Sequence, residues 1–139
     1  MKAACVIPVY NHGQRIEEVI RQALALGLPL IVVDDGSTDS TADILNRISG
    51  ITMIRHPKNQ GKGAALLTGF AAAVKQGCDG AITIDGDGQH RPEDARTLLL
   101  AVPEGRRVIV VGRREGMVGK NVPWTSRFGR GFSDRKSVV

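Results

Sequence analysis

Aromatic residues and cysteines are both scarce in this chain of 139 residues. Phe, Trp and Tyr make up 4% of the sequence, whereas glycine alone occurs 17 times. Small aliphatic residues and many glycines favour one domain of closely packed α/β layers over a β-sandwich. The two cysteines, Cys5 and Cys78, have neither metal-ligand spacing nor a disulfide framework around them. We therefore expect two reduced, buried thiols in a cytosolic protein.

Long hydrophobic runs and two phosphate-binding motifs are missing as well. No segment reaches the roughly 20 apolar residues that a transmembrane helix needs. The first apolar run, residues 3–9, contains Pro8 and predicts a strand and not a signal peptide. No G-x-G-x-x-G motif follows it, and the segment NQGKGAAL (59–66) lacks the earlier glycine and the Ser/Thr of a P-loop. The sequence thus disfavours a dinucleotide site and a P-loop site.

The net charge of +5 is unevenly distributed along the chain. Residues 1–103 carry 10 basic and 11 acidic side chains, whereas residues 104–139 carry 9 basic and 3 acidic ones. A basic surface can bind nucleic acid, an anionic membrane or phosphorylated substrates. Nucleic acid is the weakest of these, because few aromatic residues are available to stack on bases.

Short apolar strands alternate with helical patterns. Strands are predicted at residues 3–9, 29–35, 51–56, 80–85 and 107–114, and helices at residues 13–27, 40–48, 61–77 and 92–101. The first helix has one apolar face, formed by Ile16, Val19, Ile20, Ala23 and Leu24. Asp39 or Ser40 is the expected N-cap of the second helix. In the third helix, Leu66, Phe70 and Val74 share one side.

Polar residues follow the predicted strands. Strands joined by crossover helices predict a mostly parallel sheet, and such sheets bind ligands at the carboxyl ends of their strands. The segments found there are Pro8-Val9-Tyr10-Asn11, Asp34-Asp35-Gly36-Ser37, Asp85-Gly86-Asp87 and Gly112-Arg113-Arg114. The sequence therefore predicts a functional site at this edge of the sheet.

The carboxylates at these strand ends leave two interpretations open. Asp85 and Asp87, two positions apart on a glycine-flanked turn, can bind one oxygen-loving cation together. Mg²⁺ or Mn²⁺ bound there would accept phosphate oxygens and neutralise a departing diphosphate. The alternative is a solvated turn, since Asp and Gly are common turn residues. Asp34, Asp35 and Asp39 either cap the next helix or accept hydrogen bonds from a base or ribose.

Three further residues, one lysine and two histidines, have simpler interpretations. Lys62 is in the first turn of the third predicted helix, where a cation is unfavourable unless an anion lies nearby. Taken alone, Lys62 is interpreted as a surface lysine. We expect His56 and His90 at turn or surface positions, and only His90 gains interest from the neighbouring aspartates.

Five segments together resemble a known family. They are VIPVYN (6–11), IVVDDGSTDST (31–41), HPKNQGKGAALLTGF (56–70), TIDGDGQHRPED (83–94) and VVGRR (110–114). Their order and spacing resemble inverting glycosyltransferase family 2, most closely its polyprenyl-phosphate, dolichol-phosphate mannosyltransferase-like members. The resemblance covers about residues 3–133. It implies the GT-A fold, a Rossmann-like three-layer α/β fold with a mostly parallel central sheet, here incomplete at the C-terminus.

The resemblance also implies a role for individual residues. The residues expected to bind the nucleotide-sugar are Pro8, Tyr10, Asn11, Asp35, Lys62, Asp85, Gly86 and Asp87, with Pro8, Tyr10 and Asp35 at the base and ribose. The expected catalytic residues are Asp85, Asp87 and Arg114, with Arg114 facing the diphosphate. Asp87 and Gln89 would hold Mg²⁺ or Mn²⁺ in a D-x-D element.

Residues 1–133 are expected to form a partial nucleotide-sugar-binding domain, and residues 134–139 a non-native tail. The segment NVPWTSRFGRGFS (121–133) resembles the start of the family's acceptor-side region. Trp124 beside Arg127 and Arg130 suits an interface that is apolar at one end and wet at the other. We therefore expect these three residues to face an anionic membrane surface and the phosphate of a lipid acceptor.

The resemblance implies a metal-dependent hexosyltransferase that moves a sugar from a nucleotide-diphosphate sugar to a polyprenyl-phosphate lipid, in cell envelope biogenesis. The protein would be cytoplasmic and peripheral to the inner face of the cell membrane, without a nucleic-acid partner. Two alternatives remain open. The chain is a glycosyltransferase for a saccharide or protein hydroxyl, which requires a carboxylate base, or a donor-binding fragment without turnover.

Overall fold

The computed structural model describes residues 2–86 and 92–100 of the chain. The chain divides into two compact units, Met1–Arg96 and Thr97–Val139. All described strands lie in the first unit. The elements in order are β1 (Ala3–Val9), α1 (Ile16–Leu24), β2 (Leu30–Asp34), α2 (Thr41–Asn46), β3 (Thr52–Arg55), α3 (Lys62–Lys75), β4 (Gly80–Thr83) and α4 (Pro92–Leu100). Every strand and helix predicted up to residue 100 is present. The strand predicted at residues 107–114 lies outside the described residues.

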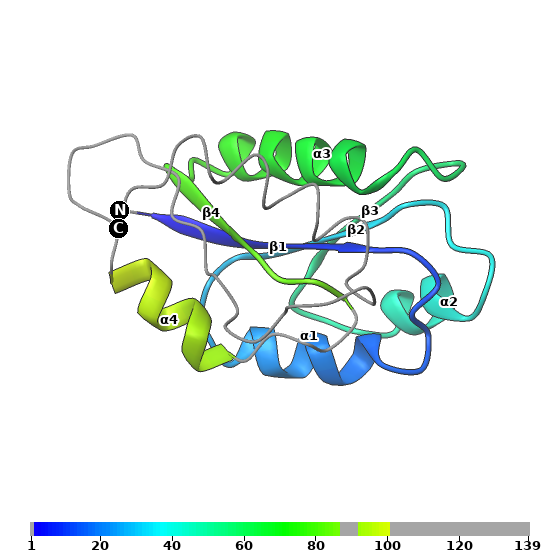
Figure 1. Ribbon diagram of the computed structural model, residues 1–139, viewed down its shortest axis with the longest axis horizontal. Coiled ribbons are helices and arrows are strands. Elements are labelled where there is room, and N and C mark those ends of the chain that lie inside the picture. Colours follow the sequence, from blue (N-terminus) through cyan, green and yellow to red (C-terminus); the bar gives the residue numbers. More distant parts are fainter. Residues whose placement is uncertain (1, 87–91, 101–139) are drawn as a thin grey trace, which may run out of the picture. The chain divides into compact units, whose positions relative to one another are not determined.

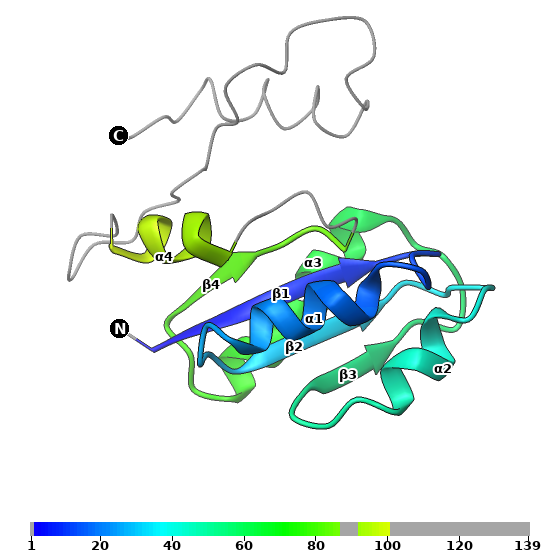
Figure 2. The same ribbon diagram turned by 90° about the horizontal axis from the view of Figure 1, so that it is seen from below.

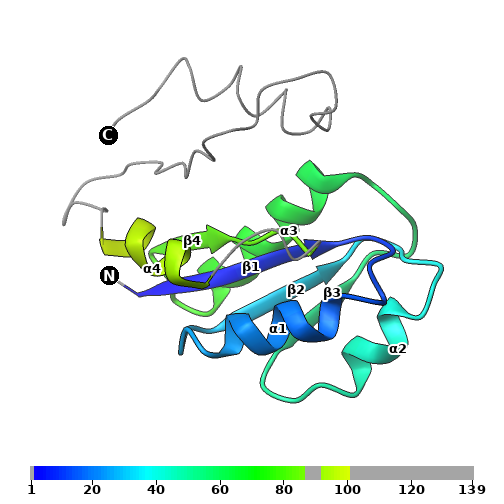
Figure 3. The same cartoon turned by 60° about the horizontal axis from the view of Figure 1, so that its bottom comes forward.

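The four strands form one sheet in the order β3-β2-β1-β4 (Figure 2), and every described pair is parallel. Helix α3 covers one face of the sheet, and α1 and α2 lie on the other (Figure 1). The two central strands are buried along their whole length, because helices cover both of their faces. Figure 3 shows α1 and α2 beside each other across the sheet from α3. The predicted three-layer arrangement with a parallel sheet is therefore confirmed for this unit.

Helix α1 packs through the apolar face that the sequence predicts, apart from its last residue. Ile16, Val19, Ile20 and Ala23 are buried, whereas Leu24 is exposed. An added Cβ on Gly50, in the α2–β3 connection, would lie 3.7 Å from Leu24 Cδ2. The side chain of Leu24 therefore lies at the margin of the core, and including it in the buried face was wrong.

Helix α3 packs through a different face from the one that its large residues suggest. Its buried residues are Ala65, Gly69 and Ala73, while Phe70 is 36% and Val74 70% exposed. A Cβ added to Gly69 would overlap Cγ1 of Val6 in β1. Small residues let the helix backbone approach the sheet closely. The contact face is thus shifted by one position from the side that carries Leu66, Phe70 and Val74.

Both cysteines are free and buried, as predicted. Cys5 lies in β1, where burial raises the pKa of its thiol to about 12. Cys78 comes two residues before β4 and belongs to the core cluster under α3. None of the helices within residues 2–86 and 92–100 is long and apolar enough to span a membrane.

Candidate functional site

Three strand ends meet at one edge of the sheet. Val9 is aligned with Asp34 in the β1–β2 register, and the backbone N–H of Asp35 donates to the carbonyl oxygen of Val9 at 2.9 Å. On the other side of β1, Gly86 lies so close that an added Cβ would be 3.3 Å from Val9 Cβ and 3.4 Å from the carbonyl oxygen of Pro8. The predicted meeting of these strand ends is confirmed for β1, β2 and β4.

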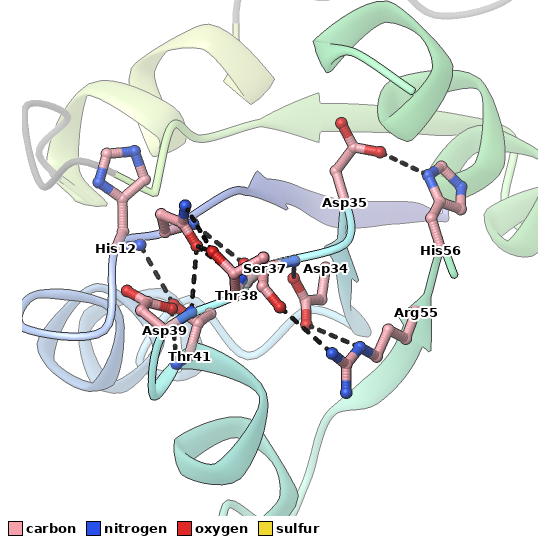
Figure 4. Close-up of polar contacts among 10 residues, drawn as sticks. His12, Asp34, Asp35, Ser37, Thr38, Asp39, Thr41, Arg55 and His56 are labelled. Carbon is pink, nitrogen blue, oxygen red and sulfur yellow. Dashed lines mark hydrogen bonds and ion pairs between the residues drawn. The ribbon is translucent and has the colours of Figure 1, made fainter. Parts of the chain in front are cut away.

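The Asp35 carboxylate is the centre of a buried hydrogen-bond cluster at this edge (Figure 4). Its Oδ1 lies 2.7 Å from His56 Nδ1 and accepts from the backbone N–H of Gln60 at 2.9 Å. Its Oδ2 accepts from the backbone N–H of Gly61 at 2.8 Å. The other ring nitrogen of His56, Nε2, lies 2.8 Å from Thr68 Oγ1 in α3. The cluster therefore joins the ends of β2 and β3 to α3.

Asp35 is ionised at neutral pH. Burial would raise the pKa of its carboxyl, but the hydrogen bonds from His56, Gln60 and Gly61 outweigh burial and lower that pKa below its ordinary value of 3.8. A carboxylate offers about four acceptor positions. Asp35 Oδ2, which accepts only the Gly61 N–H among the described contacts, keeps capacity for a ligand hydrogen bond.

Asp34 faces the opposite side of β2 from Asp35 (Figure 4) and has a structural role. It is fully buried, and its Oδ1 accepts from the backbone N–H of Ser37 at 3.0 Å. Its Oδ2 has no hydrogen bond among the described residues and faces Arg55 Nε at 3.6 Å. Arg55 also donates from Nη2 to the carbonyl oxygen of Ser37 at 3.2 Å. Asp34 therefore stabilises the turn that leads to α2 and does not cap the helix itself, which begins at Thr41.

The loops after β1 and β2 are tied together through Asn11, whose φ is 53°. Asn11 Oδ1 accepts from the backbone N–H groups of Thr38 at 2.8 Å and Asp39 at 3.3 Å. Asp39 Oδ1 in turn accepts from the N–H of Thr41, the first residue of α2, at 2.9 Å. Hydrogen bonding to Thr41 holds the pKa of Asp39 below its ordinary value, although burial opposes this. Ser40, at the N-cap position, makes no side-chain capping bond, so Asp39 is the capping side chain.

An ion pair joins Lys62 and Asp85 at this edge of the sheet. Lys62 Nζ lies 2.5 Å from Asp85 Oδ1, and both side chains are partly exposed, at 44% and 33%. Lys62 is the first residue of α3, and Asp85 follows β4. The anion that a lysine in the first helical turn requires is therefore a carboxylate of the same chain. The structure brings these two predicted site residues together.

Among the remaining predicted site residues, Tyr10 is described by the structure and lies beside the strand ends, where it is 42% exposed. The predicted residues that lie outside the described ones are Asp87, Gln89, His90, Arg114, Trp124, Arg127 and Arg130. Within residues 2–86 and 92–100, no group of three or more His, Cys, Asp or Glu side chains could hold a metal ion. Asp85 nevertheless supplies a partly exposed carboxylate. Carboxylate and amide oxygens, the groups that the predicted ligands Asp87 and Gln89 carry, suit Mg²⁺ or Mn²⁺.

The sequence profile of glycosyl transferase family 2 matches residues 4–137. The chain belongs to this family. Within glycosyl transferase family 2, it is 32% identical over 143 residues to a UDP-N-acetylglucosamine–dolichyl-phosphate N-acetylglucosaminyltransferase of Methanococcus voltae, covering 89% of this chain and 57% of the relative. It is 33% identical over 119 residues to an undecaprenyl-phosphate 4-deoxy-4-formamido-L-arabinose transferase of Salmonella choleraesuis, covering 78% of this chain and 36% of the relative.

An uncharacterized protein of Methanocaldococcus jannaschii is 34% identical over 127 residues, covering 89% of this chain and 52% of that protein. The chain thus spans about half the length, or less, of these curated relatives. The described part of the candidate site comprises the ends of β1, β2 and β4.

His56 and Thr68 are members of the hydrogen-bond cluster around Asp35 that the sequence did not reveal. His56 is 8% exposed, so its assignment to a turn or surface position was wrong. It directly follows β3, and its backbone N–H donates to the carbonyl oxygen of Asp34 at 2.8 Å, which places the ring at the same sheet edge as Asp35. A histidine as the last residue of a predicted strand, after a preceding strand with an acidic end, was the available signal.

Proposed function

We propose that this chain binds the nucleotide-sugar donor in a glycosyltransferase that transfers a sugar to a polyprenyl phosphate. Membership of glycosyl transferase family 2 supports the transferase class. The names of the Methanococcus voltae and Salmonella choleraesuis relatives, which specify dolichyl phosphate and undecaprenyl phosphate, support the lipid acceptor. The observation that carries the proposal is the Lys62–Asp85 pair at the carboxyl edge of the sheet, where a cation and a carboxylate are presented together.

The residues at this edge would divide the work on the donor. Pro8, Tyr10 and Asp35 would form the surface for the base and ribose, with Asp35 accepting one hydrogen bond at Oδ2. Lys62 would leave Asp85 and pair with a phosphate of the donor, since an ammonium binds phosphate as a point charge. Gly86 would hold the backbone after β4 close to the end of β1, because it has no side chain there.

Metal dependence is part of the proposal. Asp87 and Gln89 would hold Mg²⁺ or Mn²⁺, and the bound ion would supply positive charge for the departing diphosphate. Arg114 would face the same diphosphate. The phosphate of the acceptor is largely ionised at neutral pH, so positioning and charge stabilisation would matter more than a general base. Inversion at the anomeric carbon would follow from one in-line displacement.

The acceptor implies a location. A polyprenyl phosphate resides in a membrane, so the protein would act at the inner membrane face, with Trp124, Arg127 and Arg130 toward the lipid. Anionic lipids attract clustered Lys and Arg over about a Debye length, which fits the basic composition of residues 104–139.

A thermal-shift experiment on this chain tests the donor site. Uridine, guanosine and thymidine diphosphates are added with Mg²⁺, with Mn²⁺ or with a chelator, to the wild type and to Asp87→Ala. At 100 times Kd, a ligand that binds only the folded state adds about 2.7 kcal/mol, which raises Tm by several degrees. We expect a metal-dependent rise with one of the diphosphates and its loss in Asp87→Ala. An unchanged Tm with all of them would overturn the proposal, and equal shifts with and without chelator would overturn its metal part.

A further inference from the structure

We propose that His56 is a positioning residue for Lys62, acting through Asp35 and the first turn of α3. The inference rests on the proposed function in that Lys62 is the residue presented to the donor diphosphate. His56 itself is buried and lies behind the strand ends, so it acts through other residues.

The backbone of the sheet fixes the imidazole of His56. The N–H of His56 donates to the carbonyl oxygen of Asp34 at 2.8 Å and extends the β2–β3 pairing beyond the last strand residue. The ring then bridges two elements, with Nδ1 2.7 Å from Asp35 Oδ1 and Nε2 2.8 Å from Thr68 Oγ1. Both contacts survive a change of protonation, because Nε2 accepts from the threonine hydroxyl when neutral and donates to it when protonated. His56 is therefore a fixed bridge between the sheet and α3.

The start of α3 depends on a carboxylate from another part of the chain. The N-cap residue, Gly61, has φ 99° and no side chain to cap the helix. The N–H groups of Gln60 and Gly61 donate instead to Asp35, at 2.9 and 2.8 Å. A negative charge at this end also suits the helix dipole. Asp35 thus sets where α3 begins, and His56 orients Asp35 through Oδ1, the oxygen that also accepts the Gln60 N–H.

The segment before α3 has little freedom to move independently. A Cβ added to Gly36 would overlap the backbone carbon of Lys58 and lie 2.5 Å from the nitrogen of Asn59. The β3–α3 connection therefore runs directly against the turn after β2. Lys62 follows Gly61 immediately, so its position is determined by the contacts of Asp35 and His56 and not by its own ion pair alone.

Loss of the His56 ring would release both attachments. Asp35 would lose its side-chain partner, and α3 would lose the bond at Thr68, two turns from its start. Lys62 would then sample positions away from Asp85 and from a bound diphosphate. Displacements of about 1 Å at a binding site can reduce function by about two orders of magnitude. We therefore expect a marked effect on diphosphate affinity from a residue that cannot contact the diphosphate.

The test measures diphosphate affinity by calorimetry in a double-mutant cycle. Uridine, guanosine and thymidine diphosphates with Mg²⁺ are titrated into the wild type, His56→Ala, Lys62→Met and the double variant. We expect His56→Ala to weaken the diphosphate that binds by about tenfold, and to add less than twofold when Lys62 is already Met. Equal tenfold effects in both backgrounds would overturn the proposal, because His56 would then act independently of Lys62. His56→Asn, whose amide can replace Nδ1 toward Asp35 but cannot reach Thr68, should weaken the affinity only several-fold, as Thr68→Val does.

A milder pair of variants keeps the test valid if His56→Ala does not fold. Thr68→Val removes only the hydroxyl next to His56 Nε2. The control, Thr52→Val, removes a hydroxyl that accepts from Gln76 Nε2 at 3.1 Å, just past the other end of α3. Thr68→Val should weaken diphosphate binding several-fold, and Thr52→Val should leave it unchanged. Equal effects of the two variants would contradict positioning of the N-terminal turn.

A second readout does not depend on the proposed function. The coupling between Lys62 and Asp85 is measured from urea unfolding of Lys62→Met, Asp85→Asn and the double variant, with His56 present and with His56→Asn or Thr68→Val. Partly exposed ion pairs contribute about two- to fivefold in the unfolding equilibrium constant. We expect this coupling in the wild type and a similar decrease in His56→Asn and Thr68→Val, because both variants lose the bond between residues 56 and 68. If no diphosphate binds but this pattern holds, the proposed function fails and the positioning role stands. An unchanged coupling in Thr68→Val would overturn the positioning role.

Discussion

Lys62 Nζ and Asp85 Oδ1 lie 2.5 Å apart, which joins the first residue of α3 to the segment that follows β4. In the sheet order β3-β2-β1-β4, Asp85 follows the edge strand β4. Lys62 begins the helix that follows the other edge strand, β3. Their side chains remain partly exposed, so each can exchange its partner for a phosphate or a metal ion. We therefore expect the charges of Lys62 and Asp85 to be the first that a bound donor would meet.

Replacement of Lys62 should reduce diphosphate affinity. Lys62→Met removes one charge-assisted contact, for which we expect a loss of about tenfold or more in Kd with Mg²⁺ present. Calorimetric titration with the diphosphate that gives the thermal shift measures this loss. Lys75→Met, at the other end of α3, is the matched control and should change Kd by less than twofold. Similar losses in both variants would indicate a general charge effect instead of a contact by Lys62.

Two glycines of α3 should respond in opposite ways to the same substitution. Gly69→Ala places a methyl group against Val6, and overpacking of this kind costs about 1–3 kcal/mol. Gly63 has open space around an added Cβ, and Gly63→Ala should be neutral or stabilising by up to about 1 kcal/mol. Urea unfolding of the two variants gives both values. A stabilised Gly69→Ala would mean that α3 can move away from β1 without loss.

Stability should fall in acid because of Asp35. Its pKa is lowered in the folded chain from the ordinary value of 3.8, so the folded state favours the ionised carboxylate. The resulting stabilisation is fully present above 3.8, the value expected in the unfolded chain, and is lost as the pH falls toward the lowered value. Asp35→Asn should flatten this part of the curve when unfolding free energy is measured between about pH 2 and pH 6. Asp43→Asn, at an exposed position of α2, controls for the removal of one negative charge.

Attraction to anionic vesicles should depend on the basic segment, residues 104–139. Binding to vesicles of phosphatidylglycerol should fall steeply between low and physiological salt, because surface charges are screened within about 10 Å at 0.1 M. Replacing Arg127 and Arg130 by Gln should weaken it while diphosphate binding stays within twofold. A control with Arg21 and Arg47 replaced by Gln keeps the net charge equal. If the control weakens vesicle binding as much, the attraction comes from net charge and not from this region.

Much of the described fold could be predicted from the sequence, because its signals are local. Continuous apolar runs predicted β1 and β2 as buried strands, and the residues between them carried a clear helical face. The same edge of a parallel sheet collects every strand end, so the positions of Pro8, Asp35 and Gly86 followed from topology alone. The position of Lys62 in the first helical turn indicated that an anion nearby would be favourable, but taken alone the residue was interpreted as a surface lysine and Asp85 was not identified as its partner.

The rest depends on contacts that a local pattern does not contain. Helix α3 is apolar around most of its circumference, so periodicity did not distinguish the face with Phe70 from the face with Gly69. The close approach to Val6 decides in favour of the smaller side chains. His56 is separated from Asp35 by 21 residues, and only the adjacent positions of β2 and β3 bring the two side chains together. Neither feature has a signature within its own segment.

The small residues under α3 also affect the entropy of the folded chain. Ala65, Gly69 and Ala73 have no side-chain rotamers to lose, so α3 is seated on the sheet with no loss of side-chain entropy from its own contact face. The separation of helix and sheet is then determined by the contact between the helix backbone and β-branched side chains of the strands. The χ1 angles of these side chains are themselves restricted. No change of rotamer at these three positions can loosen this contact. The helix that presents Lys62 is therefore supported in part by groups with a single conformation each.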